Sequence, residues 1–319
     1  MKILFVTATR IGDAVLSTGL LEHLIDRHPG ARFTIAAGPV AAPLFEAVPG
    51  LARLIVMTKQ PRGMHWLALY RAVAATRWDI AVDLRGSALP YLLWTRRRHV
   101  MAKGDGTEHR VRQLGRLFAL DPPPAPHLWL GAAHEERAQA LLPPGGPVLA
   151  VGPAANWRGK EWRAERFAAL AQRLTAPDGV LPQARVAVLA AAHERAQAEP
   201  LLAVLPAARR IDLVGKVDLL TAAAVLRRAS LFVGNDTGLM HIAAAVGTAT
   251  LGLFGPSPAA QYAPWGERTA IAMTATPRDA LYGPDFDHRT TGTMMDSLSV
   301  EAAEAAARAL WTRIDGRAA

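Results

Sequence analysis

Short apolar runs alternate with longer amphipathic segments along most of this 319-residue chain. The apolar runs are rich in Val, Ile, Leu and Phe, as buried strands are, whereas the longer segments carry apolar residues at helical spacing. Predicted strands cover residues 2–7, 33–37, 54–57, 80–84, 148–152, 185–190, 211–214, 230–233 and 249–254. Predicted helices cover residues 13–28, 66–77, 164–174, 194–204, 218–229 and 300–313. This alternation predicts an α/β fold in which helices cover both faces of parallel sheets.

A proline-rich stretch divides this pattern into two cycles. It covers residues 121–147 and includes the runs 122–124 and 143–147, whose Pro and Gly content is typical of a linker. We therefore predict two domains, residues 1–146 and residues 147–299, each with a doubly wound parallel sheet. Ligands of such sheets bind beyond the carboxyl ends of the strands, so the turns after predicted strands are candidate sites.

The segment from Gly234 to Gly247 is the most informative of these turns. It follows an apolar strand and opens a helix rich in small residues. Backbone N–H groups and the positive end of the helix dipole meet at such a turn, which predicts an anion site, most often a phosphate site. We expect Asp236 to cap the turn, because a free carboxylate beside a phosphate would repel it. His241 either donates to the phosphate or packs.

Three further turns carry candidate side chains. Asp13 follows the first predicted strand and is either a side chain that faces the ligand or an N-cap. Lys160 lies in the first turn of the second cycle, and its ammonium either binds a diphosphate or is exposed in a loop. Glu194 follows the strand that ends near residue 190. Its carboxylate either accepts two ribose hydroxyls or is favoured at a helix start by the dipole.

Composition excludes several classes of chemistry. The chain has no cysteine, so disulfides, thiolate metal sites and Cys nucleophiles are excluded. No signal-peptide pattern opens it, and no uncharged apolar stretch is long enough to span a membrane. The dinucleotide fingerprint, the P-loop lysine motif and a serine nucleophile elbow are absent, and the histidines lack zinc spacing. Asp285-Phe286-Asp287 matches the short D-x-D pattern, but three-residue matches are common and we expect no metal site there.

Charge is uneven along the chain. Residues 1–146 carry most of the formal net charge of +9, which is consistent with either an acidic partner or a merely Arg-rich composition. A phosphorylated glycolipid, an anionic membrane surface and nucleic acid all fit the charge. Nucleic acid is disfavoured, because no known reading motif or pattern of stacking aromatics occurs. The run of arginines at 96–98 is by default a solvated face.

Several motifs together resemble a known enzyme family. The run 236–241, Asp-Thr-Gly-Leu-Met-His, with the alanines 243–245 and the later run 253–257, resembles the signature of glycosyltransferase family 9, the ADP-heptose:lipopolysaccharide heptosyltransferases. The opening run 10–18 and the run Lys160-Glu161-Trp162 are similar to the same family. The resemblance covers nearly the whole chain.

The resemblance implies a GT-B fold with two Rossmann-like domains. The first domain would bind the acceptor and the second the nucleotide-sugar donor, with a final helix, 300–319, crossing back to the first domain. Family members are inverting enzymes that need no metal or other cofactor, so the donor, expected to be an ADP-sugar, is a substrate. The implied acceptor is a lipopolysaccharide core or a related surface glycan. A cytoplasmic enzyme with peripheral contact to the anionic inner-membrane leaflet is expected.

Residue roles follow from the resemblance position by position. Asp13 would be the general base that deprotonates the acceptor hydroxyl. The donor would be held by Asn156, Lys160, Glu194, Val217, Asp236, Thr237, Gly238, Leu239 and His241. The acceptor contacts are instead expected from charge, because a lipopolysaccharide acceptor carries phosphates and carboxylates. The candidates are Gly12 and the basic residues Lys59, Arg62, Arg85, Arg96, Arg97, Arg98 and Lys103.

Two alternatives to a glycosyltransferase stay open at this point. The same phosphate turn also serves GT-B enzymes of other reactions, such as nucleotide-sugar epimerases, and non-catalytic nucleotide-sugar-binding proteins. Ala190 and Ala155 replace residues that the family often has as Gly and Thr, and the cysteines frequent after its second sheet are absent. The donor base and sugar therefore stay open, as do the linkage and the oligomeric state.

Overall fold

A computed structural model describes residues 1–102, 104, 106–283 and 286–315. The chain forms two compact units, Met1–Gly131 and Ala132–Ala319. The division therefore falls after residue 131 and not after residue 146. The reason is α6 (Ala132–Leu141), which packs against α9 (Leu219–Arg227) of the second unit. Glu135 on α6 also pairs with Arg227 and Arg228.

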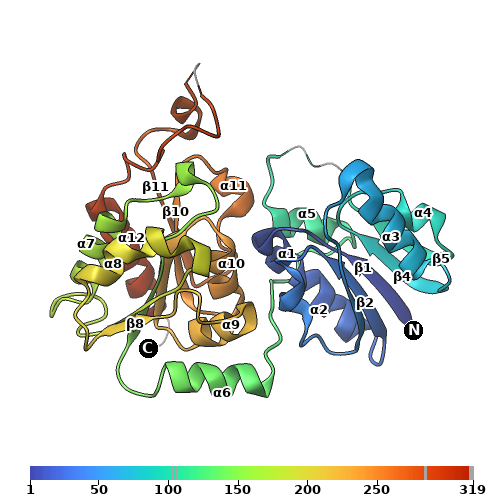
Figure 1. The fold of residues 1–319 in the computed structure, drawn as a ribbon, viewed down its shortest axis with the longest axis horizontal. Helices are drawn as coiled ribbons and strands as arrows, with labels where there is room; N and C mark the ends of the chain where they lie inside the picture. Colours follow the sequence, from blue (N-terminus) through green and yellow to red (C-terminus); the bar gives the residue numbers. More distant parts are fainter. Residues whose placement is uncertain (103, 105, 284–285, 316–319) are drawn as a thin grey trace. The chain divides into compact units, whose positions relative to one another are not determined.

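The first unit contains a five-stranded parallel sheet in the order β3-β2-β1-β4-β5 (Figure 1). Its strands are β1 (Lys2–Val6), β2 (Arg32–Ala37), β3 (Leu51–Val56), β4 (Trp78–Asp83) and β5 (Thr95–Val100). The sequence predicted four of these strands. It missed β5, because this strand lies at the edge of the sheet and its exposed positions are arginines.

The helices of the first unit are α1 (Ile11–Leu16), α2 (Thr18–Arg27), α3 (Met64–Val73), α4 (Leu89–Leu92) and α5 (Arg110–Arg116). Two 3-10 turns, η1 (Ala42–Phe45) and η2 (Pro61–Gly63), join them. The single helix predicted over 13–28 is broken at Ser17. The hydroxyl of Ser17 donates to Ala14 O at 2.7 Å, and that of Thr18 donates to Val15 O at 2.6 Å.

The second unit contains a six-stranded parallel sheet in the order β11-β10-β9-β6-β7-β8. Its strands are β6 (Val148–Gly152), β7 (Arg185–Val188), β8 (Arg210–Asp212), β9 (Leu231–Asn235), β10 (Ala249–Phe254) and β11 (Thr269–Met273). β6, β9 and β10 are buried along their whole length, which explains their continuous apolar runs. The partly exposed edge strand β11 was not predicted.

Helices cover both faces of the second sheet (Figure 1). The longer ones are α7 (Ala164–Leu174), α8 (Arg195–Val204), α10 (Gly238–Ala245) and α12 (Val300–Asp315), with α6 and α9. The short elements are α11 (Ala259–Tyr262), η3 (Arg158–Lys160), η4 (Ala192–Glu194) and η5 (Arg278–Leu281). α7 contacts α8 and α12, whereas α9 contacts α6 and α10.

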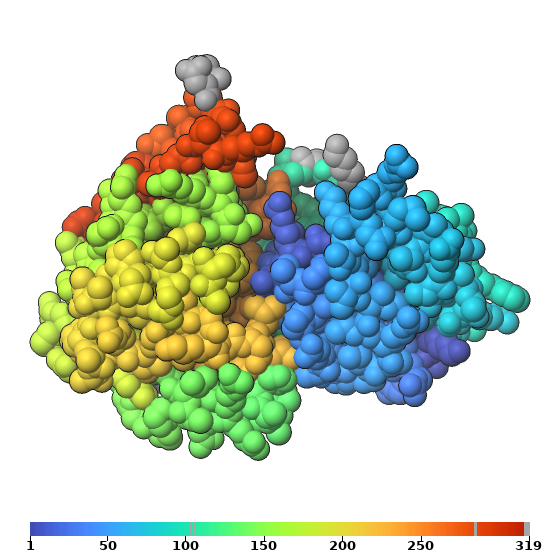
Figure 2. Space-filling view, viewed as in Figure 1, coloured from blue at the N-terminus to red at the C-terminus, as the bar shows by residue number. Residues whose placement is uncertain are grey.

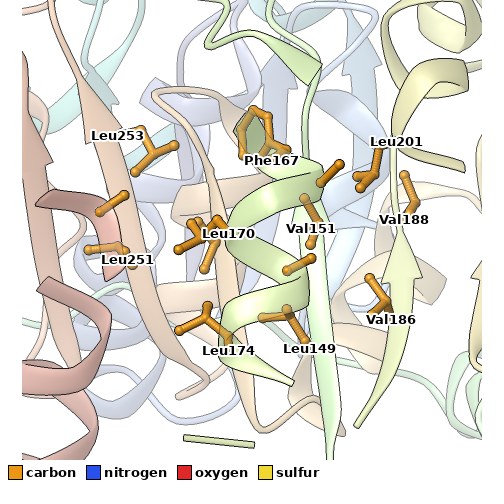
Figure 3. Close-up of a cluster of buried hydrophobic side chains, with 14 of the residues drawn as sticks. Leu149, Val151, Phe167, Leu170, Leu174, Val186, Val188, Leu201, Leu251 and Leu253 are labelled. Carbon is orange, nitrogen blue, oxygen red and sulfur yellow. The ribbon is translucent and has the colours of Figure 1, made fainter. Parts of the chain in front are cut away.

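The core of the second unit lies between α7 and the sheet. Phe167, Leu170 and Leu174 of α7 share one buried cluster with Leu149 and Val151 of β6, as Figure 3 shows. The described part of the last helix belongs to this core as well. Ala303, Ala307 and Leu310 of α12 are fully buried, and the helix packs on α7, β10 and β11. The resemblance placed this helix with the first domain, but its apolar stripe is occupied within the second unit.

Candidate functional site

The candidate site of the second unit forms where three neighbouring strands end. β9, β6 and β7 lie side by side, so the turns that follow them meet at one edge of the sheet. The turn after β9 leads into α10, the loop after β6 carries Lys160, and the turn after β7 carries Glu194. The structure thus brings together candidates that are far apart in sequence.

An ion pair joins two of these turns. Lys160 Nζ donates to Asp236 Oδ2 at 2.6 Å, and only 8% of the Asp236 side chain is exposed. His241, which is 4% exposed, places Nε2 3.8 Å from the other carboxylate oxygen of Asp236. The carboxylate therefore holds the ammonium at the turn. A lysine ammonium has three N–H donors, so this pair leaves Lys160 able to donate to a ligand as well.

The N-cap of α10 corrects one prediction. Thr237, and not Asp236, is the N-cap residue, and its side chain makes no capping hydrogen bond. Residues Thr237, Gly238 and Leu239 are partly exposed, although the strand before them and Met240 after them are buried. The first N–H groups of a helix have no acceptor within that helix. This turn therefore offers backbone donors to an anion at the positive end of the helix.

A buried amide holds this arrangement together. Asn235 is 0% exposed; its Oδ1 accepts from Trp162 N at 3.1 Å and its Nδ2 donates to Pro153 O at 2.8 Å. Both partners belong to the loop after β6, so one side chain fixes that loop to the end of β9. Trp162 is buried, and its indole N–H donates to Leu298 O at 2.9 Å. Sequence reasoning missed Asn235, although its place between the strand and the phosphate turn was a signal.

The remaining donor candidates lie around this centre. Asn156 is exposed in the loop after β6, and Val217 is partly buried just before α9. Glu194 Oε2 accepts from Ala191 N at 2.8 Å, which is the helix-start role expected of a carboxylate there. Burial raises the pKa of Glu161, next to Lys160; Arg158 lowers that pKa and the Glu194 carboxylate raises it.

In the first unit, Asp13 follows β1. It lies in the first turn of α1, where it is partly buried, and the N-cap of that helix is Arg10. The interpretation of Asp13 as an N-cap is therefore wrong. Gly12 precedes it in the same turn. β1 pairs with β4, so Asp13 and Arg85 follow neighbouring strands at the same edge of the first sheet.

Arg85 is held by a buried carboxylate and an aromatic ring. Asp83 is 0% exposed, and it accepts hydrogen bonds from Arg85 N, Ser87 N and Ser87 Oγ. The Arg85 guanidinium lies over the Trp66 ring, 4.8 Å from its centroid. Arg85 lines a pocket of about 340 Å³ with Leu84, Gly86, Met101, Ala102, Gly104 and Arg110. Arg110, which the sequence did not single out, adds a second cation to this pocket.

The other basic candidates of the first unit are dispersed. Lys59 and Arg62 are exposed near the start of α3. Arg97 is paired with Ile80 partway along the edge strand β5, so it does not lie at the carboxyl end of the strands, where Arg85 does. It lies near His99, whose pKa is lowered by burial and by Arg97, although a hydrogen bond with Leu117 O raises it. Lys103 and Asp285 lie outside the described residues.

Neither a metal cluster nor a membrane span is found in the parts that the structure describes. There, no three His, Cys, Asp or Glu side chains gather as metal ligands would. The Asp287 carboxylate of the D-x-D match accepts from Arg289 N at 2.8 Å. No helix in the same ranges is long and apolar enough to cross a lipid bilayer.

Comparison with known sequences decides the family. The profile of glycosyltransferase family 9 (heptosyltransferase) matches residues 68–281. The chain belongs to this family. It is accordingly a glycosyltransferase, and the alternatives of an epimerase and of a non-catalytic binding protein are set aside.

Individual relatives support this assignment along most of the chain. Lipooligosaccharide heptosyltransferase 2 of Haemophilus influenzae is 24% identical over 303 residues, covering 83% of this chain and 86% of the relative. Lipopolysaccharide heptosyltransferase 1 of Pseudomonas aeruginosa is 28% identical over 301 residues, covering 81% and 79%. The structure of the E. coli ADP-heptose lipopolysaccharide heptosyltransferase II aligns with a TM-score of 0.76 at 20% identity, over 99% of this chain and 100% of that one. The predicted GT-B fold is confirmed.

The geometry around Asn235 generates a stability prediction. Asn235→Ala leaves Trp162 N–H and Pro153 C=O buried without these partners, and each such loss costs about 1–3 kcal/mol. We expect the free energy of unfolding of the second unit to fall by roughly 2–4 kcal/mol in urea titrations followed by tryptophan fluorescence. Gln172→Ala, which removes an exposed amide on α7, is the matched control and should be neutral. Equal stability of the two variants would refute the bridging role.

Proposed function

We propose that this enzyme transfers heptose from ADP-heptose to a lipopolysaccharide core acceptor, with inversion and without a metal ion. The observation that carries the donor assignment is the turn at α10, where three partly exposed residues begin the helix next to a lysine paired with a buried carboxylate. The choice of substrates is supported by the relatives, which are lipopolysaccharide or lipooligosaccharide heptosyltransferases and include an ADP-heptose enzyme.

The donor diphosphate binds at the start of α10 in this proposal. Thr237, Gly238 and Leu239 donate backbone N–H groups to its oxygens, and Lys160 adds a positive charge. Asp236 does not face the phosphate as a free carboxylate, because its charge is paired with Lys160 at 2.6 Å. His241 lies on the other side of Asp236. Glu194 has a second carboxylate oxygen that can accept from the ribose hydroxyls. Asn156 would contact the donor from the loop after β6, and Val217 from the segment before α9.

The transfer is one displacement at the anomeric carbon. Asp13 takes the proton of the acceptor hydroxyl, and the resulting oxygen attacks the sugar from the face opposite the diphosphate. The bond from the anomeric carbon to ADP breaks, and ADP leaves with the electron pair, so the configuration inverts. The helix amides and Lys160 stabilise the charge that develops on the leaving group. These donors supply what a divalent cation supplies in other transferases, so the mechanism needs no cofactor.

The acceptor binds to the first unit. Asp13, Gly12 and Arg85 lie at the carboxyl edge of its sheet, and Arg110 lines the same pocket as Arg85. Guanidinium groups pair with phosphates and carboxylates in a bidentate way, which suits a phosphorylated glycolipid. Lys59 and Arg62 are exposed and extend the basic surface, whereas Arg97 lies away from this edge. Because such an acceptor resides in a membrane, we place the enzyme in the cytoplasm with peripheral contact to the inner leaflet.

A nucleotide panel tests the donor site. ADP at about one hundred times its dissociation constant should stabilise the protein by about 2.7 kcal/mol, visible as a thermal shift, whereas UDP, GDP, dTDP and CMP should not. EDTA should leave the ADP shift unchanged. In the double variant Lys160→Met with Asp236→Asn the ADP shift should shrink, because the ammonium that would bind the phosphate is removed. The second substitution ensures that no buried carboxylate is left unpaired. An ADP shift that disappears in EDTA would contradict metal independence, and a shift with another diphosphate only would contradict the donor.

The base assignment is tested by Asp13→Asn. An amide cannot accept the hydroxyl proton, so we expect turnover to fall by about 10²–10⁴-fold. The ADP thermal shift should stay as in the unmodified enzyme. Release of ADP and the change in mass of a heptose-free core acceptor give the rate. Asp26→Asn, on the exposed face of α2, is the control and should be fully active.

Two outcomes would count against these assignments. Substantial residual turnover by Asp13→Asn would show that another group is the base. Conversion of ADP-heptose without an acceptor would show that the enzyme does not act as a simple transferase.

A further inference from the structure

A cluster of exposed apolar side chains lies at one edge of the first unit. The segment 89–94 reads Leu-Pro-Tyr-Leu-Leu-Trp and is apolar throughout, but the core takes up only part of it. Leu89, Pro90 and Leu93 are buried, whereas Tyr91, Leu92 and Trp94 are 67%, 66% and 69% exposed. Leaving these three side chains in water is unfavourable, so the protein bears a cost that folding alone does not explain.

The backbone that carries the exposed side chains is held in place. Arg98 Nε donates to Pro90 O at 2.7 Å and its Nη2 donates to Leu93 O at 3.3 Å, which fixes the turn of α4 to β5. Trp78 N donates to Trp94 O at 2.9 Å. These backbone contacts present the apolar side chains as a fixed surface.

Two arginines belong to the same edge of the first unit. The guanidinium of Arg77 lies over the Trp94 ring, 5.1 Å from its centroid, and Arg96 is 71% exposed. The acidic residue of this region is Asp79, whose carboxylate lies 3.8 Å from the Arg96 guanidinium and accepts from Lys2 N at 2.8 Å. We call Tyr91, Leu92, Trp94, Arg77 and Arg96 the edge patch.

The edge patch is separate from the candidate active site. Thr95, which follows Trp94, is paired with Trp78 at the amino end of β4, whereas Asp13 and Arg85 follow the carboxyl ends of their strands. β5 is the last strand of the sheet, and among the residues that the structure describes no further strand pairs with it. The teal atoms of this region form the outer margin of the first unit in Figure 2.

The charges of the edge patch indicate which kind of partner binds there. A second copy of the chain docked through the same patch would bring arginines against arginines, which repel. An anionic bilayer complements both the apolar and the cationic side chains of the edge patch. Trp and Tyr favour the headgroup region, where their rings are buried and their polar atoms stay hydrated, and each Arg near an anionic leaflet adds attraction. We propose that the edge patch docks the enzyme on an anionic phospholipid surface, with Trp94, Tyr91 and Leu92 at headgroup depth. The proposal rests on the proposed function only for the presence of the acceptor in such a membrane.

Vesicle sedimentation tests this docking. The full-length protein should sediment with phosphatidylcholine vesicles that contain about 30% phosphatidylglycerol, and much less with phosphatidylcholine alone. Leu92→Ser with Trp94→Ser should weaken binding at least about tenfold. Arg77→Glu with Arg96→Glu should weaken it by roughly 30-fold or more, and about 0.5 M NaCl should act in the same direction.

Matched controls separate this surface from general effects. Val204→Ser with Met273→Ser removes two exposed apolar side chains elsewhere, 51% and 48% exposed, and should bind as the unmodified protein does. Arg268→Glu with Arg289→Glu gives the same net charge change on exposed positions of the second unit and should have the smaller effect. Equal losses in test and control variants would overturn the proposal.

Lipids with brominated acyl chains give a direct readout. They should quench tryptophan emission of the unmodified protein, and the quenching should fall in Trp94→Phe. Unchanged quenching in Trp94→Phe would overturn the assignment. A dimer that forms without vesicles and dissociates in Leu92→Ser with Trp94→Ser would overturn it as well. Leu92→Ser with Trp94→Ser should also keep its turnover on a lipid-free acceptor. Loss of vesicle binding with retained turnover therefore separates this proposal from the proposed function, and vesicle binding stays measurable even if no transfer is found.

Discussion

The side chain of Asn235 is the constraint on which the second unit's site depends. Parallel strands bring the ends of β6 and β9 to one edge, but they do not fix the loops that leave those ends. The Asn235 amide does so with one accepted and one donated hydrogen bond, to Trp162 N and Pro153 O. Lys160 lies two residues before Trp162, so the position of its ammonium follows from this bridge. The indole of Trp162 anchors the same loop from the other side.

The buried acid beside a phosphate turn has an electrostatic explanation. A carboxylate that is 8% exposed is costly unless it is paired, and a lysine near a helix N-terminus is repelled by the positive end of the dipole. Asp236 and Lys160 resolve both problems for each other. The pair holds the ammonium where the helix amides also point, so these donors are oriented before a ligand arrives. Such preorganisation is the main source of electrostatic stabilisation in active sites.

Sequence patterns predicted the parts of the fold that are buried on both faces. β6, β9 and β10 read as apolar runs because helices cover them, and the edge strands β5 and β11 were missed because one side of each meets solvent. The break at Ser17 was missed because its cause is hydroxyl bonds to the helix backbone, which spacing does not show. The candidate site was predicted as a set of turns. Its internal geometry was not, because the partner of Asp236 lies 76 residues away in sequence.

The carboxyl ends of the strands in the first sheet and its β5 edge carry different kinds of residues, because of how a parallel sheet is built. The carboxyl ends of β1 and β4 carry the polar turns with Asp13 and Arg85, since every strand of the sheet points its loops there. The edge strand β5 has a side that no other described strand pairs with, and such a side must be protected from pairing with the strands of other molecules. Arginines at that side prevent such pairing and leave a cationic surface. Next to it, α4 cannot bury both of its sides against one sheet, so apolar side chains remain exposed. The apolar and cationic side chains that we propose to dock on anionic lipid thus lie at a sheet edge that no other described strand covers.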